Sequence, residues 1–476
     1  MLKTSFNNIL FNGFDSNCSE KLPQSFQDNH NVYWITNKTR YLKNPNVRQI
    51  NNLHIGPLPP KKKKSIHLQA FKQYEEEYFY LLNRLYPYLG YIPKWEKRII
   101  LNRQISYWDD VLTNNKIDLF IGSNLPHEIH DYVINRLCIL RSIPTLYYYQ
   151  VFQNCMVLVD KISQIKNLVK GTGSSNAKQN CEGIELFIYN LNKLTNEDYV
   201  PPFYMDPKVI SREQNNRDKK KNLQKKIPLY KRLGNPINYQ YTFNEHLYKR
   251  GMKVYQALLS RTYNDAALNS IPSQKYLYFP LHLQPEMTTC PQGGKFYNQL
   301  EIIKKISTLL PPNIFLAVKE NPKQTWICRS YNFYKTLKQN DKVKILGTNV
   351  NSSELIKASI GVVTVTGTAG WEAIFANKPV IAFGYASFSP IEGVYRISKD
   401  LDIVEAINLL LDGTIYPGIS KEMFFEQLNT ISTLAVSSQY YFDNSVIKDN
   451  ETNITNLLKL LESNRYSLKL DPVHNS

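Results

Sequence analysis

The sequence predicts an α/β protein with two Rossmann-like domains that face each other across a cleft. The chain has 476 residues, more than the roughly 250 to 300 residues at which a single core stops growing. Short apolar runs alternate with helical periods in both halves of the chain, which is the pattern of a sheet built from βαβ units. Between about residues 165 and 248 the pattern weakens, so two domains are expected.

We place the first domain at residues 1–260 and the second at residues 272–425. The weak zone contains the loop GTGSSNAKQN and the polar, basic stretch REQNNRDKKKNLQKK, which cannot bury enough apolar surface to order itself. It is either an elaboration of the first domain or the linker between the domains.

The first half reads as strands and helices in alternation. Val32–Thr36 is a β-branched and aromatic run ended by turn-forming residues, and Ile117–Ser123 is apolar enough for a strand buried on both faces. A helix over about His127–Leu140 and the strand IPTLYYY complete a βαβ unit. The other elements expected here are a strand at Asn8–Phe11 and a helix at Ile66–Leu85.

The second half repeats this alternation more clearly. Five runs predict strands: KYLYFPL, NIFLAVKE, VKIL, IGVVTVT and PVIAFG. Helical periods lie between them in Tyr297–Leu309, SSELIKAS and WEAIFAN. Ligands in such sheets bind outside the carboxyl ends of the strands, so polar residues at those ends are the candidates for function.

Composition excludes several classes of protein. Hydrophobic residues make up 42% and charged residues 21% of the chain, which is ordinary for a globular protein. The six cysteines lie far apart, with no CxxC pair and no Cys/His cluster at zinc-ligand spacing. We therefore expect a reducing compartment and no metal site. No signal peptide and no apolar run of about 18 residues is visible, so we expect a cytoplasmic protein.

The net charge of +18 suits nucleic acid, an anionic membrane surface or a phosphate-bearing substrate. The absence of zinc-finger, RRM and KH signatures argues against nucleic acid. Peripheral contact with an anionic inner membrane stays open. The run Lys219–Lys226 is more simply a solvated charge run, and the lysine-rich background as a whole can reflect genome composition.

The most informative segment is a glycine turn. A β-branched strand runs into Gly367, Thr368, Ala369 and Gly370, and a helix begins straight after. Small residues let a ligand approach the backbone, and the N–H groups of a new helix attract an anion such as a donor phosphate. Glu372 in the first turn could accept hydrogen bonds from ribose hydroxyls. The alternative is a tight strand-to-helix turn whose glutamate offsets the helix dipole.

Polar side chains also follow two other strands of this half. His282, Gln284 and Glu286 alternate along an extended segment, and Lys319 ends the next strand. A histidine here could bind phosphate or transfer a proton, Lys319 suits a phosphate or a sugar carboxylate, and Glu286 is a further catalytic candidate. The alternatives are a structural histidine and a surface lysine.

The first half offers candidates for a catalytic base. His127 and Asp131 lie at the strand-to-helix turn, four residues apart, and would share one helix face. Acidic residues also favour helix N-termini without any catalytic role. Asp15, after the first strand, is a weaker candidate. The Asp400–Asp402 segment matches a metal-binding DxD pattern, but helix capping explains it more simply.

The segment Tyr276–Ala386, with YFPLHLQPE, VKENP and VVTVTGTAGWEAIFANKPVIAFG, resembles the capsule polysaccharide biosynthesis family related to bacterial Kdo transferases. IDLFIGSNLPHEIHD resembles it more loosely. The resemblance implies a GT-B glycosyltransferase that uses a nucleotide-sugar, CMP-linked in Kdo-related members, and no bound metal. Gln284 and Pro285 match the family's Gln-Pro motif, whereas Asn321 and Pro322 stand where the family has His-Pro.

The resemblance also implies that residues 426–476 form helices that pack back on the first domain. Val380 stands where many retaining GT-B enzymes have a second glutamate, eight residues after Glu372, which favours an inverting mechanism. The hypothesis is a glycosyltransferase that transfers a sugar to a glycan or lipid-linked glycan acceptor during surface polysaccharide synthesis. The rivals are a sugar 2-epimerase or glycerophosphotransferase on the same fold, and an inactive scaffold of a polysaccharide assembly complex.

Overall fold

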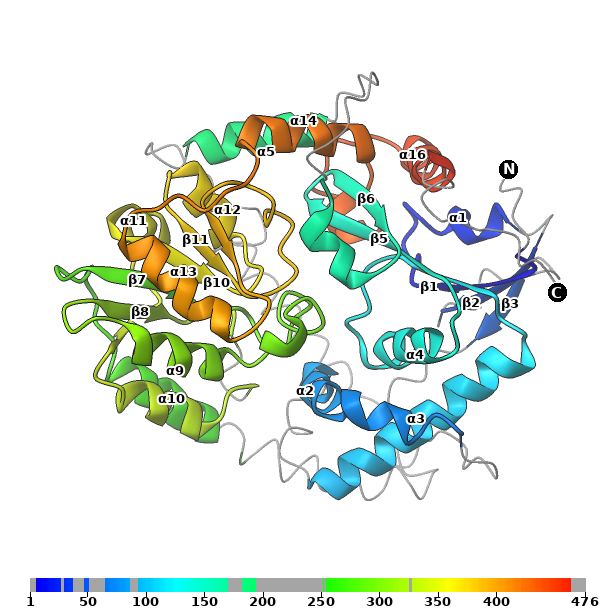
Figure 1. Ribbon diagram of the computed structural model, residues 1–476. Coiled ribbons are helices and arrows are strands. Elements are labelled where there is room, and N and C mark those ends of the chain that lie inside the picture. The colour runs from blue at the N-terminus through cyan, green and yellow to red at the C-terminus, as the bar shows by residue number, and fades with distance from the viewer. Residues whose placement is uncertain are drawn as a thin grey trace.

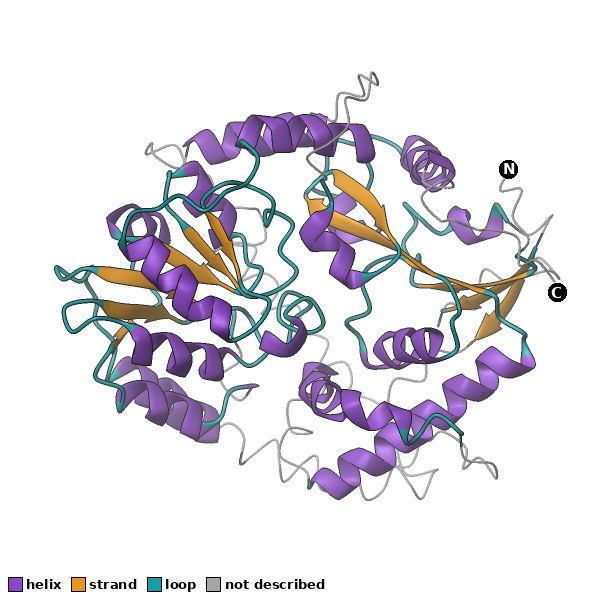
Figure 2. Ribbon diagram, viewed as in Figure 1, coloured by secondary structure: helices purple, strands orange, loops and turns teal. Residues whose placement is uncertain are grey.

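The computed structural model contains two separate six-stranded sheets, each flanked by helices (Figures 1 and 2). It describes residues 6–26, 30–36, 47–50, 65–85, 93–169, 182–193, 251, 254–324 and 328–463. Most of the weak zone, including the run at 219–226, lies outside these residues. The predicted fold class, two Rossmann-like α/β domains, is confirmed.

The N-terminal sheet has the strand order β3-β2-β1-β4-β5-β6. All neighbours pair in parallel except β5 and β6, which are antiparallel. The strand order reverses direction between β1 and β4, which is the switch point of a doubly wound sheet. The strands are β1 (Asn8–Asn12), β2 (Asn31–Ile35), β3 (Val47–Ile50), β4 (Leu119–Gly122), β5 (Thr145–Phe152) and β6 (Cys155–Val159).

The C-terminal sheet is parallel throughout, with the order β12-β11-β10-β7-β8-β9. Read from its other edge, this is the same order as in the N-terminal sheet, and its switch point lies between β7 and β10. The strands are β7 (Tyr276–Pro280), β8 (Phe315–Lys319), β9 (Val343–Leu346), β10 (Gly361–Thr364), β11 (Val380–Ala382) and β12 (Val394–Arg396).

Helices cover the sheets because the inner strands are apolar on both faces. Every residue of β4 and β10 is buried, as expected for central strands of a parallel sheet. The helices are α1 (Lys21–Gln24), α2 (Glu75–Leu85), α3 (Lys94–Asn114), α4 (Ile129–Leu140), α5 (Glu182–Asn192), α9 (Gln299–Leu309), α10 (Tyr331–Lys338), α11 (Ser352–Ala358), α12 (Ala369–Phe375), α13 (Leu401–Leu411), α14 (Lys421–Ile431), α15 (Gln439–Phe442) and α16 (Asn450–Ser463). None of the helices in the described ranges has the length and apolar character needed to cross a membrane.

The expected strands of both halves are present, but some elements differ from the prediction. The helix predicted at Ile66–Leu85 begins as turns and the 3-10 segment Ala70–Tyr74, and becomes α-helical only at Glu75. Helix α3 and strands β3, β6 and β12 were not predicted. Strands as short as β12 show too few residues for an alternation to be recognised.

The final helix lies on the N-terminal sheet. Leu457, Leu460 and Leu461 of α16 join the buried cluster that contains Ile9 and Phe11 of β1. The Tyr148 hydroxyl donates to the Leu457 carbonyl at 3.0 Å. The chain therefore returns from the C-terminal sheet to the first domain (Figure 1).

Helices α5 and α14 lie at the top of the view in Figure 1, and the rings of Phe187 and Phe425 bring them within 6.3 Å of each other. Phe187 of α5 stacks on Phe152 of β5, with ring centroids 3.9 Å apart, and meets Trp371 of α12 edge-on at 5.5 Å. Phe425 of α14 stacks on Trp371, with ring centroids 5.6 Å apart, and lies 6.3 Å from Phe187. This aromatic cluster joins the N-terminal sheet to the helix that follows the glycine turn.

Candidate functional site

The switch point of the C-terminal sheet brings His282 and the glycine turn together. His282 follows β7, and the turn follows β10, which pairs with β7. The Thr366 N–H donates to His282 Nε2 at 3.1 Å, and the Gly367 N–H donates to Thr364 Oγ1 at 3.1 Å. A Cβ on Gly367 would lie 2.9 Å from His282 Nε2, so the imidazole occupies the space that a side chain at position 367 would need.

Burial determines the chemistry of His282. Its burial, with the nearby positive charge of Arg329, lowers the pKa of His282 to about 4. The imidazole is therefore neutral near pH 7, and its Nε2 lone pair accepts the Thr366 N–H. In this arrangement His282 holds the glycine turn in place.

The glycine turn leaves two backbone donors available. The Gly370 N–H is used by the Gly367 carbonyl at 3.0 Å, and the N–H groups of Thr366 and Gly367 are used as described above. Among the described residues, no hydrogen bond engages the N–H groups of Thr368 and Ala369. Thr368 is exposed, while Gly370 packs on the Phe388 ring, which a Cβ would approach to 2.2 Å. The turn is thus accessible on its Thr368 side.

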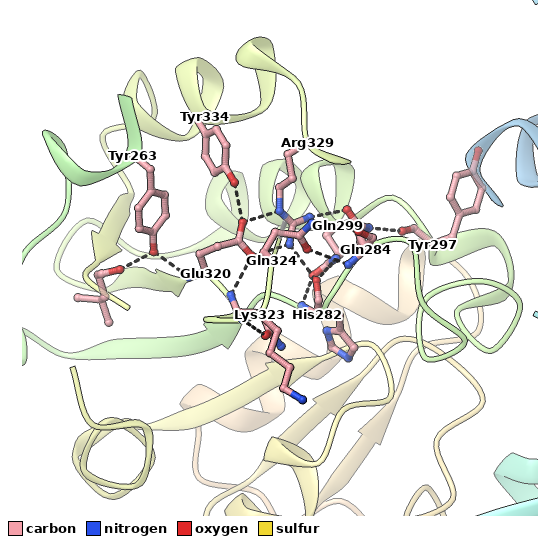
Figure 3. Close-up of polar contacts among 12 residues, drawn as sticks. Tyr263, His282, Gln284, Tyr297, Gln299, Glu320, Lys323, Gln324, Arg329 and Tyr334 are labelled. Atoms are coloured by element: carbon pink, nitrogen blue, oxygen red, sulfur yellow. Dashed lines mark hydrogen bonds and ion pairs between the residues drawn. The ribbon is translucent and has the colours of Figure 1, made fainter. Parts of the chain in front are cut away.

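A fully buried ion pair, Arg329 with Glu320, lies against the loop that follows β7 (Figure 3). Arg329 donates to both carboxylate oxygens of Glu320, at 2.5 and 2.8 Å, and both side chains are 0% exposed. The Tyr334 hydroxyl donates to Glu320 at 2.8 Å, and the Glu320 N–H donates to the Tyr263 hydroxyl at 2.7 Å. These partners fix the carboxylate and therefore the guanidinium.

Three further side chains hold the His282–Gln284 segment. The guanidinium of Arg329 donates to the Gln284 side-chain oxygen and to the His282 carbonyl. Gln324 pairs with both backbone groups of Gln284, at 2.8 and 3.0 Å. The Gln299 side chain accepts the His282 N–H at 2.7 Å and donates to the His282 carbonyl at 3.3 Å. The loop is held by side-chain amides rather than by strand pairing (Figure 3).

Lys319 is almost completely buried at the end of β8, with 7% of its surface exposed. Its ammonium donates to the Val350 carbonyl and to Ser352 Oγ. Burial lowers the pKa of Lys319 to about 8, and the negative charge of Glu372 opposes this shift. Lys319 and Glu372 are thus electrostatically coupled across the carboxyl edge of the sheet.

The remaining candidates in this half are engaged in local turns. Glu286 Oε1 accepts the Met287 N–H at 3.1 Å. Asn321, in the position of the family's histidine, accepts the Lys323 N–H at 2.9 Å. Asp402, in the first turn of α13, accepts the N–H groups of Ser398 and Lys399 at 2.8 and 2.9 Å. Asp400, at the N-cap of this helix, makes no side-chain cap hydrogen bond and pairs with Lys305 at 2.7 Å.

The candidates of the N-terminal half do not share a helix face, so that expectation was wrong. Helix α4 begins at Ile129, and His127 precedes it. The His127 Nδ1 must donate to the Leu125 carbonyl, 2.5 Å away, because a carbonyl only accepts. The His127 side chain is 16% exposed, whereas Asp131 is only 4% exposed. Asp15 accepts a hydrogen bond from the Thr36 hydroxyl.

A cavity of about 620 Å³ lies mainly in the C-terminal half of the chain, and its lining does not include the glycine turn, His282 or Gln284. Lys166 and Asn167 line it from the N-terminal half, and Gly294, Tyr385 and Arg396 are among the residues that line it from the C-terminal half. Beside it, the Gln292 side chain donates to the Tyr149 hydroxyl at 3.1 Å, a direct hydrogen bond between the halves. The two halves of the chain are therefore in direct contact beside this cavity.

Sequence reasoning missed Arg329, Gln299 and Gln324, which determine the geometry of the site. Arg329 directly precedes Ser330, whose hydroxyl caps α10. A lone cation before a helix cap gives no periodic signal, so only the fold reveals its role. Within the described parts of the chain, no group of three or more His, Cys, Asp or Glu residues could hold a metal ion.

The two Rossmann-like domains, each built on its own six-stranded sheet, have the GT-B architecture that the sequence predicts. Residues 173–401 match the family model described as capsule polysaccharide biosynthesis protein. This match confirms the resemblance read from the sequence, over just under half of the chain. No curated protein matches the sequence.

Several solved structures resemble the fold at low sequence identity. The β-Kdo 2,7 transferase of Thermosulfurimonas dismutans KpsC is 13% identical, covers 74% of this chain and 89% of its own, and has a TM-score of 0.32. The β-Kdo 2,4 transferase of the same protein is 10% identical, with 67% of this chain and 85% of its own chain covered and a TM-score of 0.33. The UDP-GlcNAc 2-epimerase of Methanocaldococcus jannaschii is 12% identical, with 89% of this chain and 97% of its own chain covered and a TM-score of 0.26. At these scores the likeness carries no conclusion about activity.

Proposed function

We propose that this protein is a glycosyltransferase that moves a sugar from a nucleotide-sugar donor to a growing capsular or other surface polysaccharide. The observation that carries the proposal is the accessible glycine turn at the C-terminal switch point, with the N–H groups of Thr368 and Ala369 uncommitted among the described residues. Backbone N–H groups at such a position bind phosphate. The match to the capsule polysaccharide family supports the same class of substrate.

In this proposal the donor phosphate accepts hydrogen bonds from Thr368 and Ala369, and Gly367 and Gly370 keep the backbone approachable. The nucleotide extends over the strand ends toward Gln284 and Lys319. The carboxylate of Glu372 accepts hydrogen bonds from ribose hydroxyls, and the same carboxylate interacts electrostatically with Lys319. His282 positions the turn rather than contacting the sugar.

The acceptor glycan enters from the N-terminal half, where His127 is the proposed base. Its Nδ1 donates to the Leu125 carbonyl, so Nε2 is the ring nitrogen that would accept the proton, and it lies 3.9 Å from Glu128 Oε1. The acceptor oxygen attacks the anomeric carbon, the bond from that carbon to the phosphate oxygen breaks, and the acceptor proton passes to Nε2. A single displacement of this kind inverts the anomeric centre. Asp131 and Glu286 are the other proposed bases, but the low exposure of Asp131 favours His127.

The leaving phosphate gains negative charge, and the N-terminal end of α12 stabilises it. We propose that this stabilisation replaces a metal ion, so activity should persist in EDTA. Lipid-linked acceptors and peripheral contact with an anionic membrane belong to the same proposal, and flotation with anionic vesicles tests that contact directly.

The experiment is a thermal-shift screen of CMP-, UDP-, GDP- and CDP-sugars, because a ligand that binds only the native state raises the apparent stability. The selected donor is then incubated with and without glycan acceptor, and the products are analysed. Transfer that requires acceptor supports the proposal. Conversion of a UDP-sugar without acceptor identifies a 2-epimerase instead, release of a glycerophosphate product identifies a glycerophosphotransferase, and binding without turnover identifies a scaffold.

A further inference from the structure

Arg329 and Glu320 form a neutral, rigid unit in the interior of the C-terminal domain. The two side chains pair through two hydrogen bonds and are both 0% exposed. Glu320 also accepts the Tyr334 hydroxyl at 2.8 Å and the Asn321 N–H at 2.8 Å. A buried carboxylate that accepts this many hydrogen bonds is held in one orientation, and it holds the guanidinium in place in turn.

The guanidinium has further N–H groups, and these point at the loop after β7 (Figure 3). One donates to the side-chain oxygen of Gln284, and another donates to the His282 carbonyl at 2.8 Å. A guanidinium only donates hydrogen bonds. The Gln284 amide must therefore turn its oxygen toward Arg329, and its nitrogen faces the opposite way, where it donates to the Tyr297 carbonyl at 3.2 Å.

We propose that Arg329 is a positioning residue that fixes Gln284 as a hydrogen-bond donor toward the nucleotide. The Gln284 nitrogen has two N–H groups, of which Tyr297 takes one, and the second is directed to the bound ligand. The ligand atom at this place is then an acceptor oxygen, either of a pyrimidine carbonyl or of a phosphate. This inference rests on the proposed function and specifies the polarity of one contact in the same site.

Lysine could not replace Arg329 in this role. The planar fork of arginine reaches Glu320 with two groups while two others hold Gln284 and His282. A lysine ammonium has three donors and no fixed plane, so it could balance the charge of Glu320 but could not hold the amide in one orientation. The conservative variant thus separates charge balance from positioning.

The experiment measures binding of CMP, UDP and ribose 5-phosphate by calorimetry. The variants are Arg329→Lys, Arg329→Met and Gln284→Glu, the last of which keeps an oxygen for Arg329 but removes both N–H groups. The control is Arg141→Met. Arg141 is a partly buried arginine of the N-terminal domain that pairs with Asp109 at 2.8 Å, far along the chain from the site. Thermal unfolding of each protein gives its stability independently of binding.

We expect Arg329→Met and Gln284→Glu to weaken CMP or UDP binding at least tenfold, and Arg329→Lys to weaken it by about threefold to tenfold. Arg141→Met should lower the unfolding temperature without changing the dissociation constant. Parallel loss of ribose 5-phosphate assigns the contact to the phosphate, and retained ribose 5-phosphate binding assigns it to the base. Both results support the inference.

Wild-type affinity in folded Arg329→Lys or Gln284→Glu protein overturns the inference and leaves the proposed function intact, as does an equal loss of affinity in Arg141→Met. If Arg329→Met does not fold, the other two variants decide. Wild-type protein that binds none of the three probes overturns this inference, and wild-type protein that also binds none of the CMP-, UDP-, GDP- and CDP-sugars overturns the proposed function.

Discussion

The N-terminal and C-terminal sheets share one strand order, so each has a switch point where loops from two adjacent strands separate. In the N-terminal sheet the side chain of Ser123 fills this place. A Cβ added to Gly13 would lie only 2.0 Å from the Ser123 Oγ. His130, which is 2% exposed, bonds to Asn12 Oδ1 at 2.9 Å. In the C-terminal sheet the turn is accessible at Thr368.

The difference shows that the strand order gives each sheet a switch point where a ligand could bind. Whether that place is open to a ligand depends on the side chains around it. At the C-terminal switch point buried partners hold the polar side chains, and among the described residues no hydrogen bond engages the N–H groups of Thr368 and Ala369. At the N-terminal switch point the polar groups bond to one another. This contrast supports our proposal that the donor binds at the C-terminal sheet, and the proposed acceptor site is the surface around His127.

The largest expected effect comes from removing the charge that balances Arg329. Glu320→Gln leaves a fully buried guanidinium without a counter-charge, which costs about 3–5 kcal/mol. The matched change in the N-terminal domain, Asp109→Asn, concerns a carboxylate that is 15% exposed beside Arg141, and should cost about 1 kcal/mol. Urea unfolding of both variants measures the difference. Equal losses would mean that the ion pair does not distinguish the domains.

The second effect is a dependence of stability on pH caused by His282. The pKa of His282 is about 4 in the folded protein, below its usual 6.5, so the unfolded chain binds more protons between these values. Stability should therefore fall as the pH drops from 6.5 to 4, by up to about 3 kcal/mol from this residue. His282→Asn should show a flatter curve over this range, measured by urea unfolding. Parallel curves for the two proteins would contradict the burial of a neutral imidazole.

Much of the fold could be predicted because its strands are local patterns. The apolar runs around β4, β7, β8 and β10 are long enough to be recognised as buried strands. Helix α3 was overlooked although Ile100, Ile105, Trp108 and Leu112 follow a helical period on its buried face.

The candidate site was predictable only in part. The glycine turn and the polar segment after β7 have signatures within a few residues of sequence. The partners that hold them do not, because Gln299, Gln324 and Arg329 lie 17, 40 and 45 residues from the groups they bind. Such contacts depend on how the strands are ordered, which a single sequence does not reveal.

The third prediction tests the two switch points with one substitution in each. Gly367→Ala places a methyl group against His282 and should displace the turn, so that nucleotide affinity falls at least tenfold, or about 1.4 kcal/mol. Gly13→Ala places one against Ser123 at a φ of +83°, and should lower stability by about 1–3 kcal/mol without changing affinity. Calorimetry and thermal unfolding separate the two outcomes. Loss of affinity in Gly13→Ala would place the nucleotide at the N-terminal switch point.

The smallest expected effect concerns the charge on Lys319. Because burial lowers the pKa of Lys319 to about 8, its ammonium is charged at pH 7 and loses its proton as the pH rises above 8. Nucleotide affinity should then decrease by about threefold between pH 7 and pH 9, since the deprotonated amine no longer offsets the charge of Glu372 near an anionic ligand.

Lys319→Met should remove this pH dependence while keeping most of the buried volume. The free energy of unfolding should change with pH in the opposite direction to the affinity. Because the unfolded chain binds more protons than the folded protein between pH 8 and 10.5, the wild type should become more stable relative to Lys319→Met as the pH rises. Calorimetric titrations at pH 7, 8 and 9 and urea unfolding over the same range test both signs. An affinity that is independent of pH in the wild type would show that Lys319 serves the packing around Ser352 and contributes no charge to the donor site.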